Sequence, residues 1–228
     1  MKMANCRLIV FAKAPLPGGV KSRLLPLLDA ETIADLYEQL ILCCLRTAVE
    51  AAVGPVDLWC TPSTEHPLFL SCSKKFRIEL YQQTEGDIGK RMAHAFHETL
   101  KKSDSALLMG TDCPSLTCAD LKEAKRKLQQ GVRAVISPAE DGGYVLLGLC
   151  QYEPQIFEGV SWGTKSVLEE TRERLGRLGW HWHELPERWD VDRPEDVKRL
   201  MSEGYLELKA IRSQLSTNGA PLFKKSER

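Results

Sequence analysis

The segment RLIVFAKAPLPGGVKSRL, residues 7–24, joins a short apolar run to a loop rich in proline, glycine and basic residues. The run at 8–12 has the length and the residue types of a buried β-strand. The prolines and glycines that follow exclude a helix and form a stiff loop whose backbone amides can approach a ligand. A helical apolar stripe comes next, at 31–52. The order strand, loop, helix is typical of an α/β sheet.

The stripe at 31–52 repeats apolar residues at steps of three and four. Its members are Ile33, Leu36, Tyr37, Leu40, Ile41, Cys44, Leu45, Ala48 and Val49. This spacing predicts a helix packed on a sheet, because such residues share one face. We interpret all of them as core residues and none as part of a binding site.

Strand and helix patterns alternate along the rest of the chain. Strands are predicted at 56–60, 78–81, 106–109, 134–137 and 144–149, a further edge strand at 180–185, and helices at 88–101, 117–130, 165–178, 194–204 and 205–214. Thr117 and Asp120 resemble a capping box. The alternation predicts a three-layer α/β/α sandwich with a mostly parallel sheet. We expect one domain over 1–214 and a loose tail over 215–228.

Composition limits the function classes. The 228 residues are 43% hydrophobic and 27% charged, which suits one globular core. Lys plus Arg and Asp plus Glu number 31 each, so no net charge favours nucleic acid or an anionic membrane. The eight cysteines contain no C-x-x-C pair, which favours buried thiols over zinc or disulfides. Because no signal peptide or membrane span is visible, we expect a cytoplasmic protein without nucleic-acid or membrane partners.

The loop after the first strand carries cations. Lys13, Lys21 and Arg23 have no acidic residue between them, and Gly18 and Gly19 leave room for close approach. In open α/β sheets, ligands bind beyond the carboxyl ends of the strands. The loop therefore indicates a phosphate site, although it matches neither the P-loop nor the dinucleotide fingerprint. A solvated basic loop is the alternative.

Acidic residues follow later strands. Asp112 comes directly after the strand at 106–109 and is a candidate ligand for a divalent cation, with a cap for the following turn as the alternative. Asp190 and Asp192 alternate in an extended segment, so they point the same way and suit a metal. A cap for the helix at 194–204 accounts for Asp192 equally well.

Two glycine-containing segments also follow strands. Residues 140–143 (Glu-Asp-Gly-Gly) fit a hairpin turn, but the polar groups at neighbouring strand ends favour a site that includes Asp141, Gly142 and Gly143. Gly86 and Asp87 open a helix on which Arg91 could bind phosphate or ribose. Whether Asp87 only caps that helix stays open.

Five ordered motifs together resemble one family. They are K-x-P-x-P-G-x-V-K-[ST]-R-L at 13–24, G-D-[IL]-G-x-R-M at 86–92, G-T-D-x-P-x-L at 110–116, P-A-x-D-G-G-Y-x-L-[IL]-G-L at 138–149 and W-x-T at 162–164. The set, which spans about 8–200, resembles the DUF2064 family of GT-A-like transferases, related to molybdenum cofactor and phospholactate guanylyltransferases. The resemblance implies a GT-A fold, with a nucleotide-binding half over about 1–112 and an acceptor half over about 113–214.

The resemblance also assigns residues. It implies that Ala12, Lys13, Lys21 and Arg23 hold nucleotide phosphates and that Gln83, Gly86, Asp87 and Arg91 line the nucleotide side. It implies that Asp112 binds Mg²⁺ or Mn²⁺, with Asp190 or Asp192 as a second ligand. Arg193 stands where the family has a small residue, which places a cation beside Asp192.

We expect a metal-dependent transferase that joins a nucleotide-activated donor to a small-molecule acceptor. A glycosyltransferase acting on a nucleoside diphosphate sugar is favoured. Lys21, Arg23 and Asp112 would stabilise the leaving group, and Asp141 would bind the acceptor or act as general base. Trp162 and Tyr144 are candidates for the acceptor wall, with core packing as the alternative for Trp162. Nucleotidyl transfer and a non-catalytic nucleotide-binding module are the other readings, and a homodimer is left open.

Overall fold

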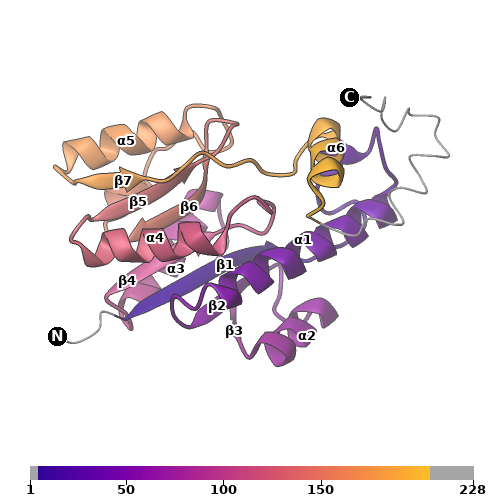
Figure 1. Cartoon of the computed structure of the whole chain (residues 1–228), viewed down its shortest axis with the longest axis horizontal. Coiled ribbons are helices and arrows are strands. Elements are labelled where there is room, and N and C mark those ends of the chain that lie inside the picture. Colours follow the sequence, from indigo (N-terminus) through magenta and orange to yellow (C-terminus); the bar gives the residue numbers. More distant parts are fainter. Residues whose placement is uncertain (1–4, 206–228) are drawn as a thin grey trace, which may run out of the picture.

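The computed structural model describes residues 5–205, which form one seven-stranded sheet covered by helices on both faces (Figure 1). The strands are β1 (Cys6–Lys13), β2 (Val56–Thr61), β3 (Glu79–Gln82), β4 (Ser105–Met109), β5 (Ala134–Pro138), β6 (Tyr144–Leu149) and β7 (Trp182–Glu184). Their spatial order is β3-β2-β1-β4-β6-β5-β7, and only β6 pairs with its neighbours in the antiparallel sense. The mostly parallel sheet is confirmed.

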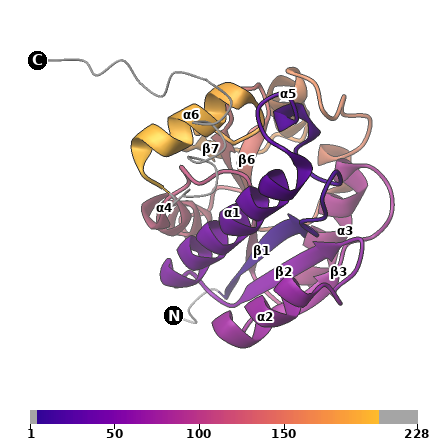
Figure 2. The ribbon, with the colours of Figure 1, turned by 90° about the vertical axis from the view of Figure 1, so that its right-hand side faces the viewer.

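The helices divide between the two faces of the sheet. They are α1 (Ala30–Glu50), α2 (Pro67–Phe76), α3 (Ile88–Leu100), α4 (Cys118–Gln129), α5 (Val167–Arg177) and α6 (Pro194–Glu203), with short 3₁₀ turns at Ser22–Leu24 and Pro154–Ile156. Residues of α1, α2, α4 and α6 share one hydrophobic cluster, while α3 and α5 contribute to the other. Figure 2 shows α1 and α2 near β1, β2 and β3.

Strand β1 explains why there are two clusters. Leu8 and Val10 belong to the first cluster, whereas Ile9 and Phe11 belong to the second. Successive side chains of a strand point to opposite faces, so a strand covered on both sides reads as a continuous apolar run. The run quoted at the start of the sequence is therefore the central strand of the sandwich.

Most predicted elements are confirmed within a few residues. Thr117 and Asp120 form the predicted capping box of α4, and all eight cysteines are free. Helix α2 was not predicted, because PLFLSCSKKF lacks an extended stripe. The helix predicted at 205–214, apart from Tyr205, and the tail predicted at 215–228 lie outside the described residues, so the domain limits stay a prediction.

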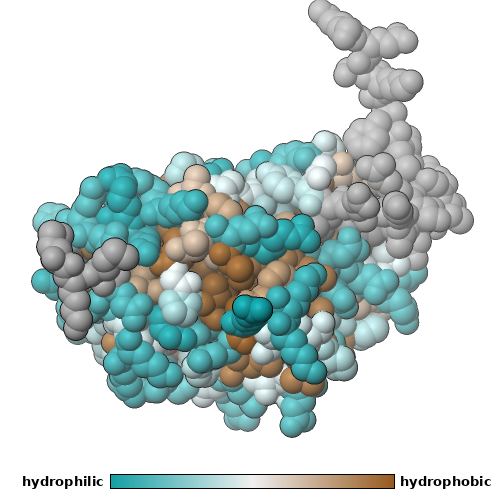
Figure 3. Space-filling view, turned by 60° about the horizontal axis from the view of Figure 1, so that its bottom comes forward, coloured by the Kyte–Doolittle hydropathy of each residue, from teal (hydrophilic) through white to brown (hydrophobic). Residues whose placement is uncertain are grey.

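The exposed large hydrophobic residues of the described chain are Leu16, Leu25, Leu70, Ile88 and Tyr205. Figure 3 shows one face, on which hydrophilic side chains surround a smaller hydrophobic area. None of the helices between residues 5 and 205 combines the length and the apolar content that crossing a bilayer requires.

The turn between β5 and β6 is a tight hairpin, as the glycines at 142 and 143 predict. Gly142 has a φ of 90°, and a Cβ built there would lie 2.3 Å from the Lys165 carbonyl oxygen. The Gly143 amide donates to Asp141 Oδ1 at 2.9 Å, and the Leu168 amide donates to the Gly142 carbonyl at 3.0 Å. The turn thus holds Asp141 while it packs directly on the start of α5.

A half-buried ion pair fixes the segment that leads to Asp190. Arg188 Nε and Nη2 donate to the two carboxylate oxygens of Asp120 at 3.0 and 2.7 Å, and the Asp120 side chain is only 7% exposed. Thr117 donates to the same carboxylate through its amide and its hydroxyl. Burial alone would raise the pKa of Asp120, but the bonds from Arg188 and Thr117 outweigh it and lower the pKa.

Arg188→Ala is expected to lower the free energy of unfolding by about 2 kcal/mol, because it leaves the Asp120 carboxylate with less compensation for its burial. Urea unfolding followed by circular dichroism measures the change. The matched control is Arg126→Ala, since Arg126 makes an exposed pair with Glu123 and should cost no more than about 0.5 kcal/mol. Equal losses in the two variants would contradict the prediction.

Candidate active site

The carboxyl ends of β1, β4 and β5 reach one edge of the sheet, where the segment before α6 also passes. A cavity of about 640 Å³ opens there. The charged residues that line it are Lys21, Arg23, Asp112, Glu140, Asp141, Lys165, Asp190, Asp192, Arg193 and Asp196. Its walls include Tyr144 and Trp162. The basic loop and the acids that follow separate strands therefore do meet, and their roles stay predictions.

Lys21 lies at the centre of this charge cluster. Its Nζ donates to Asp112 Oδ2 at 2.9 Å and lies 4.0 Å from Asp192 Oδ1. Arg23 Nη1 makes the other contact of Asp192, at 2.5 Å. The Lys21 side chain is 10% exposed, whereas the Asp112 side chain is 39% exposed. Asp112 therefore pairs with a cation of the basic loop, and its role as a metal ligand stays a prediction.

The two partners hold each other in the charged form. Burial would lower the pKa of Lys21, but the Asp112 carboxylate outweighs it and raises the pKa. Burial would likewise raise the pKa of Asp112, and the Lys21 ammonium reverses the shift and lowers it. Both directions describe the same ionised pair.

Asp190 has the opposite environment. Burial and the negative charges of Asp112 and Asp141 raise its pKa from 3.8 to about 6, although Lys21 counteracts them. This carboxyl is half-buried and has excess negative charge around it. The cavity floor is thus a place where an additional cation would be stabilised.

Asp190→Asn is expected to stabilise the protein above pH 6. The carboxyl of Asp190 binds its proton more tightly in the folded state than in the unfolded state. Its contribution to the stability of the wild type is therefore fully present below pH 4 and is lost as the pH rises through about 6. A shift of about two units corresponds to about 3 kcal/mol, which partial exposure reduces to about 1–2 kcal/mol. Calorimetric melting temperatures at pH 3.5 and pH 8 measure the effect. A variant that is equally stabilised at both pH values would contradict this origin.

A second cavity of about 430 Å³ adjoins the first, since both are lined by Lys21, Arg23 and Asp192. Its remaining walls are Lys13, Gly18, Gly19, Val20, Ser22 and Tyr37. The basic loop therefore lines a hollow with its cations and its glycine backbone, as a phosphate site requires.

Tyr37 was interpreted as a core residue and reaches the site. Its hydroxyl accepts from the Lys13 amide at 3.3 Å and lies 3.1 Å from Thr111 Oγ1, which donates to the Phe11 carbonyl at 3.1 Å. This chain of hydrogen bonds joins the loop after β1 to the residue before Asp112. The sequence held one signal for this role, since a tyrosine stands near the start of the apolar stripe and a buried phenol needs a polar partner.

The residues assigned to the nucleotide side do not line these two cavities, although Ile88 and Met92 of the same segment line the larger one. Gln83 is buried and donates from Nε2 to the carbonyls of Ala12 and Trp59 at 3.3 and 2.8 Å, so it ties β1 to β2. Arg91 donates to the Gly86 carbonyl at 2.9 Å. None of Ala12, Gln83, Gly86 and Arg91 lines the two cavities.

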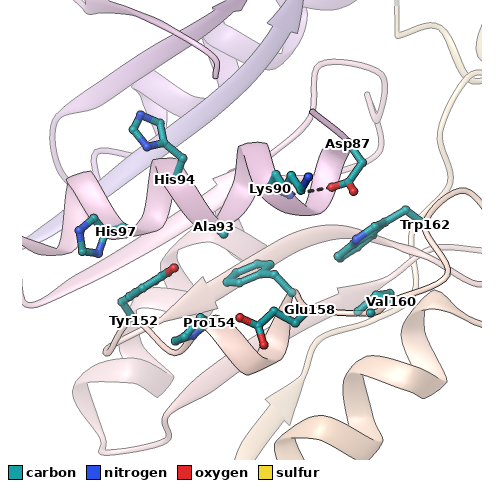
Figure 4. Close-up of a pocket in the computed structure, with 12 residues that line it drawn as sticks. Asp87, Lys90, Ala93, His94, His97, Tyr152, Pro154, Glu158, Val160 and Trp162 are labelled. Carbon is teal, nitrogen blue, oxygen red and sulfur yellow. Dashed lines mark hydrogen bonds between the residues drawn. The ribbon is translucent and has the colours of Figure 1, made fainter. Parts of the chain in front are cut away.

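Asp87 caps α3, because its Oδ1 accepts from the Lys90 amide at 2.8 Å. Asp87 also lines a third cavity, of about 620 Å³, between α3 and residues 152–162 (Figure 4). Figure 4 shows Lys90 and His97 on α3 and Tyr152, Glu158 and Trp162 on the segment that faces the helix.

Trp162 separates the third cavity from the first and lines both. Its indole lies over Gly89, where an added Cβ would be 2.1 Å from Nε1. Trp162 therefore packs against α3 and lines a cavity, and its place in an acceptor wall stays a prediction.

The acidic residues fit a divalent cation that is shared with a ligand. Among residues 5–205, no three His, Cys, Asp or Glu side chains form a preassembled metal site. Asp112 and Asp190 line one cavity, and their repulsion is what a cation would relieve. Mg²⁺ commonly binds through one or two carboxylates plus substrate phosphates, so this pair suits Mg²⁺ or Mn²⁺.

Asp192 has two cationic neighbours, since Arg23 contacts it directly and Lys21 lies 4.0 Å away, and its role as a metal ligand stays a prediction. The prediction that Asp192 caps α6 is wrong, because Arg193 is the N-cap of that helix. The Asp196 carboxylate caps the first turn of α6, because it accepts hydrogen bonds from the amides of Asp192 and Arg193 at 3.0 and 2.7 Å.

Residues 44–164 match the model of a family described as "uncharacterized protein conserved in bacteria (DUF2064)". The chain belongs to the DUF2064 family. Among curated proteins, none matches it significantly.

Solved structures show how widely this DUF2064 fold is shared. A protein from Desulfovibrio desulfuricans G20, provisionally assigned as a nucleotide-diphospho-sugar transferase, is 27% identical with a TM-score of 0.82 and covers 94% of this chain and 96% of its own. Glucosyl-3-phosphoglycerate synthase from Mycobacterium tuberculosis, crystallised with Mn²⁺ and uridine diphosphate, is 12% identical with a TM-score of 0.55 (96% and 81% covered). A 4-diphosphocytidyl-2C-methyl-D-erythritol synthase from Anaerococcus prevotii is 12% identical with a TM-score of 0.56 (90% and 99% covered). The predicted GT-A-like fold is confirmed.

Proposed function

We propose that this DUF2064 protein is a metal-dependent transferase that uses a nucleotide-activated donor, with a nucleoside diphosphate sugar as the favoured donor. The observation that carries the proposal is the meeting of Lys21, Arg23 and Asp112 on one cavity. The likeness to the Desulfovibrio protein over nearly the whole chain supports the same class of reaction.

The chain's own cations would bind the diphosphate. Lys13 and Lys21 line the smaller cavity, and Arg23 lies where the two cavities meet. They would neutralise the charge that grows on the leaving diphosphate, and each contact is worth on the order of 2–4 kcal/mol in the transition state. Asp112 and Asp190 would hold Mg²⁺ or Mn²⁺, which supplies further charge neutralisation at the diphosphate.

The acceptor would enter the larger cavity from the side of the β5–β6 turn. Asp141 lies there, held through Gly143, and Tyr144 and Trp162 provide apolar walls. We assign Asp141 to binding the acceptor hydroxyl or to removing its proton. On this proposal residues 1–112 bind the nucleotide and residues 113–214 the acceptor, and the protein works in the cytoplasm on small molecules.

The main alternative is nucleotidyl transfer, because proteins that share the fold include a 4-diphosphocytidyl-2C-methyl-D-erythritol synthase and a cytidylyltransferase. The two reactions leave different products. Purified protein is first screened by thermal shift against nucleoside triphosphates and nucleotide sugars with and without Mn²⁺, since a ligand of the native state raises the melting temperature. Turnover with the best ligand is then analysed for nucleoside diphosphate, which supports glycosyl transfer, or pyrophosphate, which supports nucleotidyl transfer.

A non-catalytic nucleotide-binding module is the remaining alternative. Ligand stabilisation without turnover of any donor across acceptor mixtures would favour it. If no diphosphate or triphosphate ligand stabilises the protein in the presence of Mn²⁺, a nucleotide-dependent function is wrong altogether.

A further inference from the structure

Lys21 is placed unusually for a phosphate-binding lysine. Its ammonium lies at the floor of the cavity, 2.9 Å from Asp112 and 4.0 Å from Asp192, and the side chain is only 10% exposed. The ammonium therefore already occupies the side of Asp112 that faces Asp192. A divalent cation that approaches Asp112 meets a positive charge in contact with the same carboxylate.

The backbone holds Lys21 in this place. Lys21 has a left-handed conformation, with φ 46° and ψ 42°, directly before the 3₁₀ turn Ser22–Leu24. This conformation is unfavourable for a residue that carries a side chain. The Leu24 amide donates to the Lys21 carbonyl at 2.9 Å, which fixes the turn.

The surrounding charges give Lys21 no second partner of equal quality. Asp192 is already bound by Arg23, and Asp190 is the carboxyl whose ionisation is disfavoured. If Lys21 left Asp112, its buried ammonium would lose its main counter-ion, which is costly. A ligand diphosphate that enters the cavity would supply a new one.

We propose that Lys21 is the resident counter-ion of Asp112 and that it makes the divalent cation and the diphosphate bind together. The Lys21 ammonium leaves Asp112 and forms an ion pair with the diphosphate. The Asp112 carboxylate is then free to bind the divalent cation. Each ligand therefore increases the affinity for the other by the same factor, because coupling between binding sites is reciprocal. The inference rests on the proposed function for the identity of the two ligands.

The test measures Mn²⁺ binding to the full chain without any turnover. Electron paramagnetic resonance counts free Mn²⁺, with and without inorganic pyrophosphate as the probe, and the Mn²⁺–pyrophosphate complex formed in solution is subtracted. In the wild type, pyrophosphate should increase Mn²⁺ affinity by at least about 10-fold, within the usual range of coupling. In Lys21→Met, Mn²⁺ alone should bind about 10-fold more tightly than in the wild type, and the enhancement should fall below about threefold.

Two further variants distinguish the release of Asp112 by Lys21 from a general effect of removing positive charge near the cavity. Lys165→Met removes the same charge from the wall of the larger cavity, where Lys165 is exposed and makes no ion pair with the described residues, and it should change the affinity for Mn²⁺ by less than about threefold. Lys21→Arg keeps the charge, so Mn²⁺ alone should stay weakly bound. Melting temperatures establish that each variant is folded.

The inference is overturned if folded Lys21→Met binds Mn²⁺ no more tightly than the wild type, or if Lys165→Met gains as much affinity. The proposed function fails separately. Coupled binding of Mn²⁺ and pyrophosphate without transferase turnover contradicts the function and leaves the role of Lys21 intact, whereas turnover combined with an unchanged Lys21→Met affinity contradicts only the role of Lys21.

Discussion

Asp112→Asn is expected to lower transferase turnover by about 1,000-fold, which corresponds to about 4 kcal/mol of lost transition-state stabilisation. The carboxylate is both the partner of Lys21 and the proposed ligand of the divalent cation. An amide of the same shape keeps the packing but removes the charge that a divalent cation requires. Steady-state turnover with the donor found in the ligand screen measures the loss.

The matched control is Asp35→Asn, because Asp35 is exposed on α1 and lines neither cavity. It should leave turnover within about twofold of the wild type, as expected for a surface substitution. If Asp112→Asn retains more than about one tenth of the activity, the carboxylate is not part of the reaction. Melting temperatures of both variants test whether a loss of activity has a structural cause.

Gly142→Ala is expected to lower the free energy of unfolding by about 3 kcal/mol. The residue combines a φ of 90°, which an alanine adopts only at a cost, with the Lys165 carbonyl at 2.3 Å from the added Cβ. Because the obstacle is backbone rather than a flexible side chain, the turn and the start of α5 must separate. Chemical denaturation measures the loss, and turnover should fall too since the turn carries Asp141.

Two other glycines calibrate this effect. Gly163 has a φ of 79° and open space around it, so Gly163→Ala isolates the backbone cost, about 1 kcal/mol. Gly176 lies in α5 with neither constraint, and Gly176→Ala should stabilise the protein by about 0.5–1 kcal/mol. A Gly142→Ala variant that is no less stable than Gly163→Ala would show that the turn and α5 separate at little cost.

Local sequence patterns were sufficient to predict the sheet and to predict that charged residues from separate strand ends lie together. The apolar run of β1 identified a strand buried on both faces, and the rule that ligands bind beyond strand ends brought Lys21, Arg23 and Asp112 to one cavity. These inferences depend only on which residues follow each strand. The direction of a strand is enough to place what comes after it.

Contacts between distant segments could not be read in the same way. Trp162 lies over Gly89, and the Tyr37 hydroxyl lies between Lys13 and Thr111, yet nothing near these residues in the sequence indicates the partner. The same limit applies to Asp192, whose choice between helix cap and site depended on Arg23 and Asp196. Side-chain partners of this kind are set by packing in three dimensions.

The contact between Arg23 and Asp192 spans 169 residues of the chain. During synthesis, the first of these residues leaves the ribosome long before the second has been translated. Non-local pairings of this kind form late, because the intervening chain has to be ordered first. A nascent chain that stops short of Asp192 therefore carries the basic loop without one of its acidic partners, and the complete charge cluster forms only after nearly all of the described chain is made.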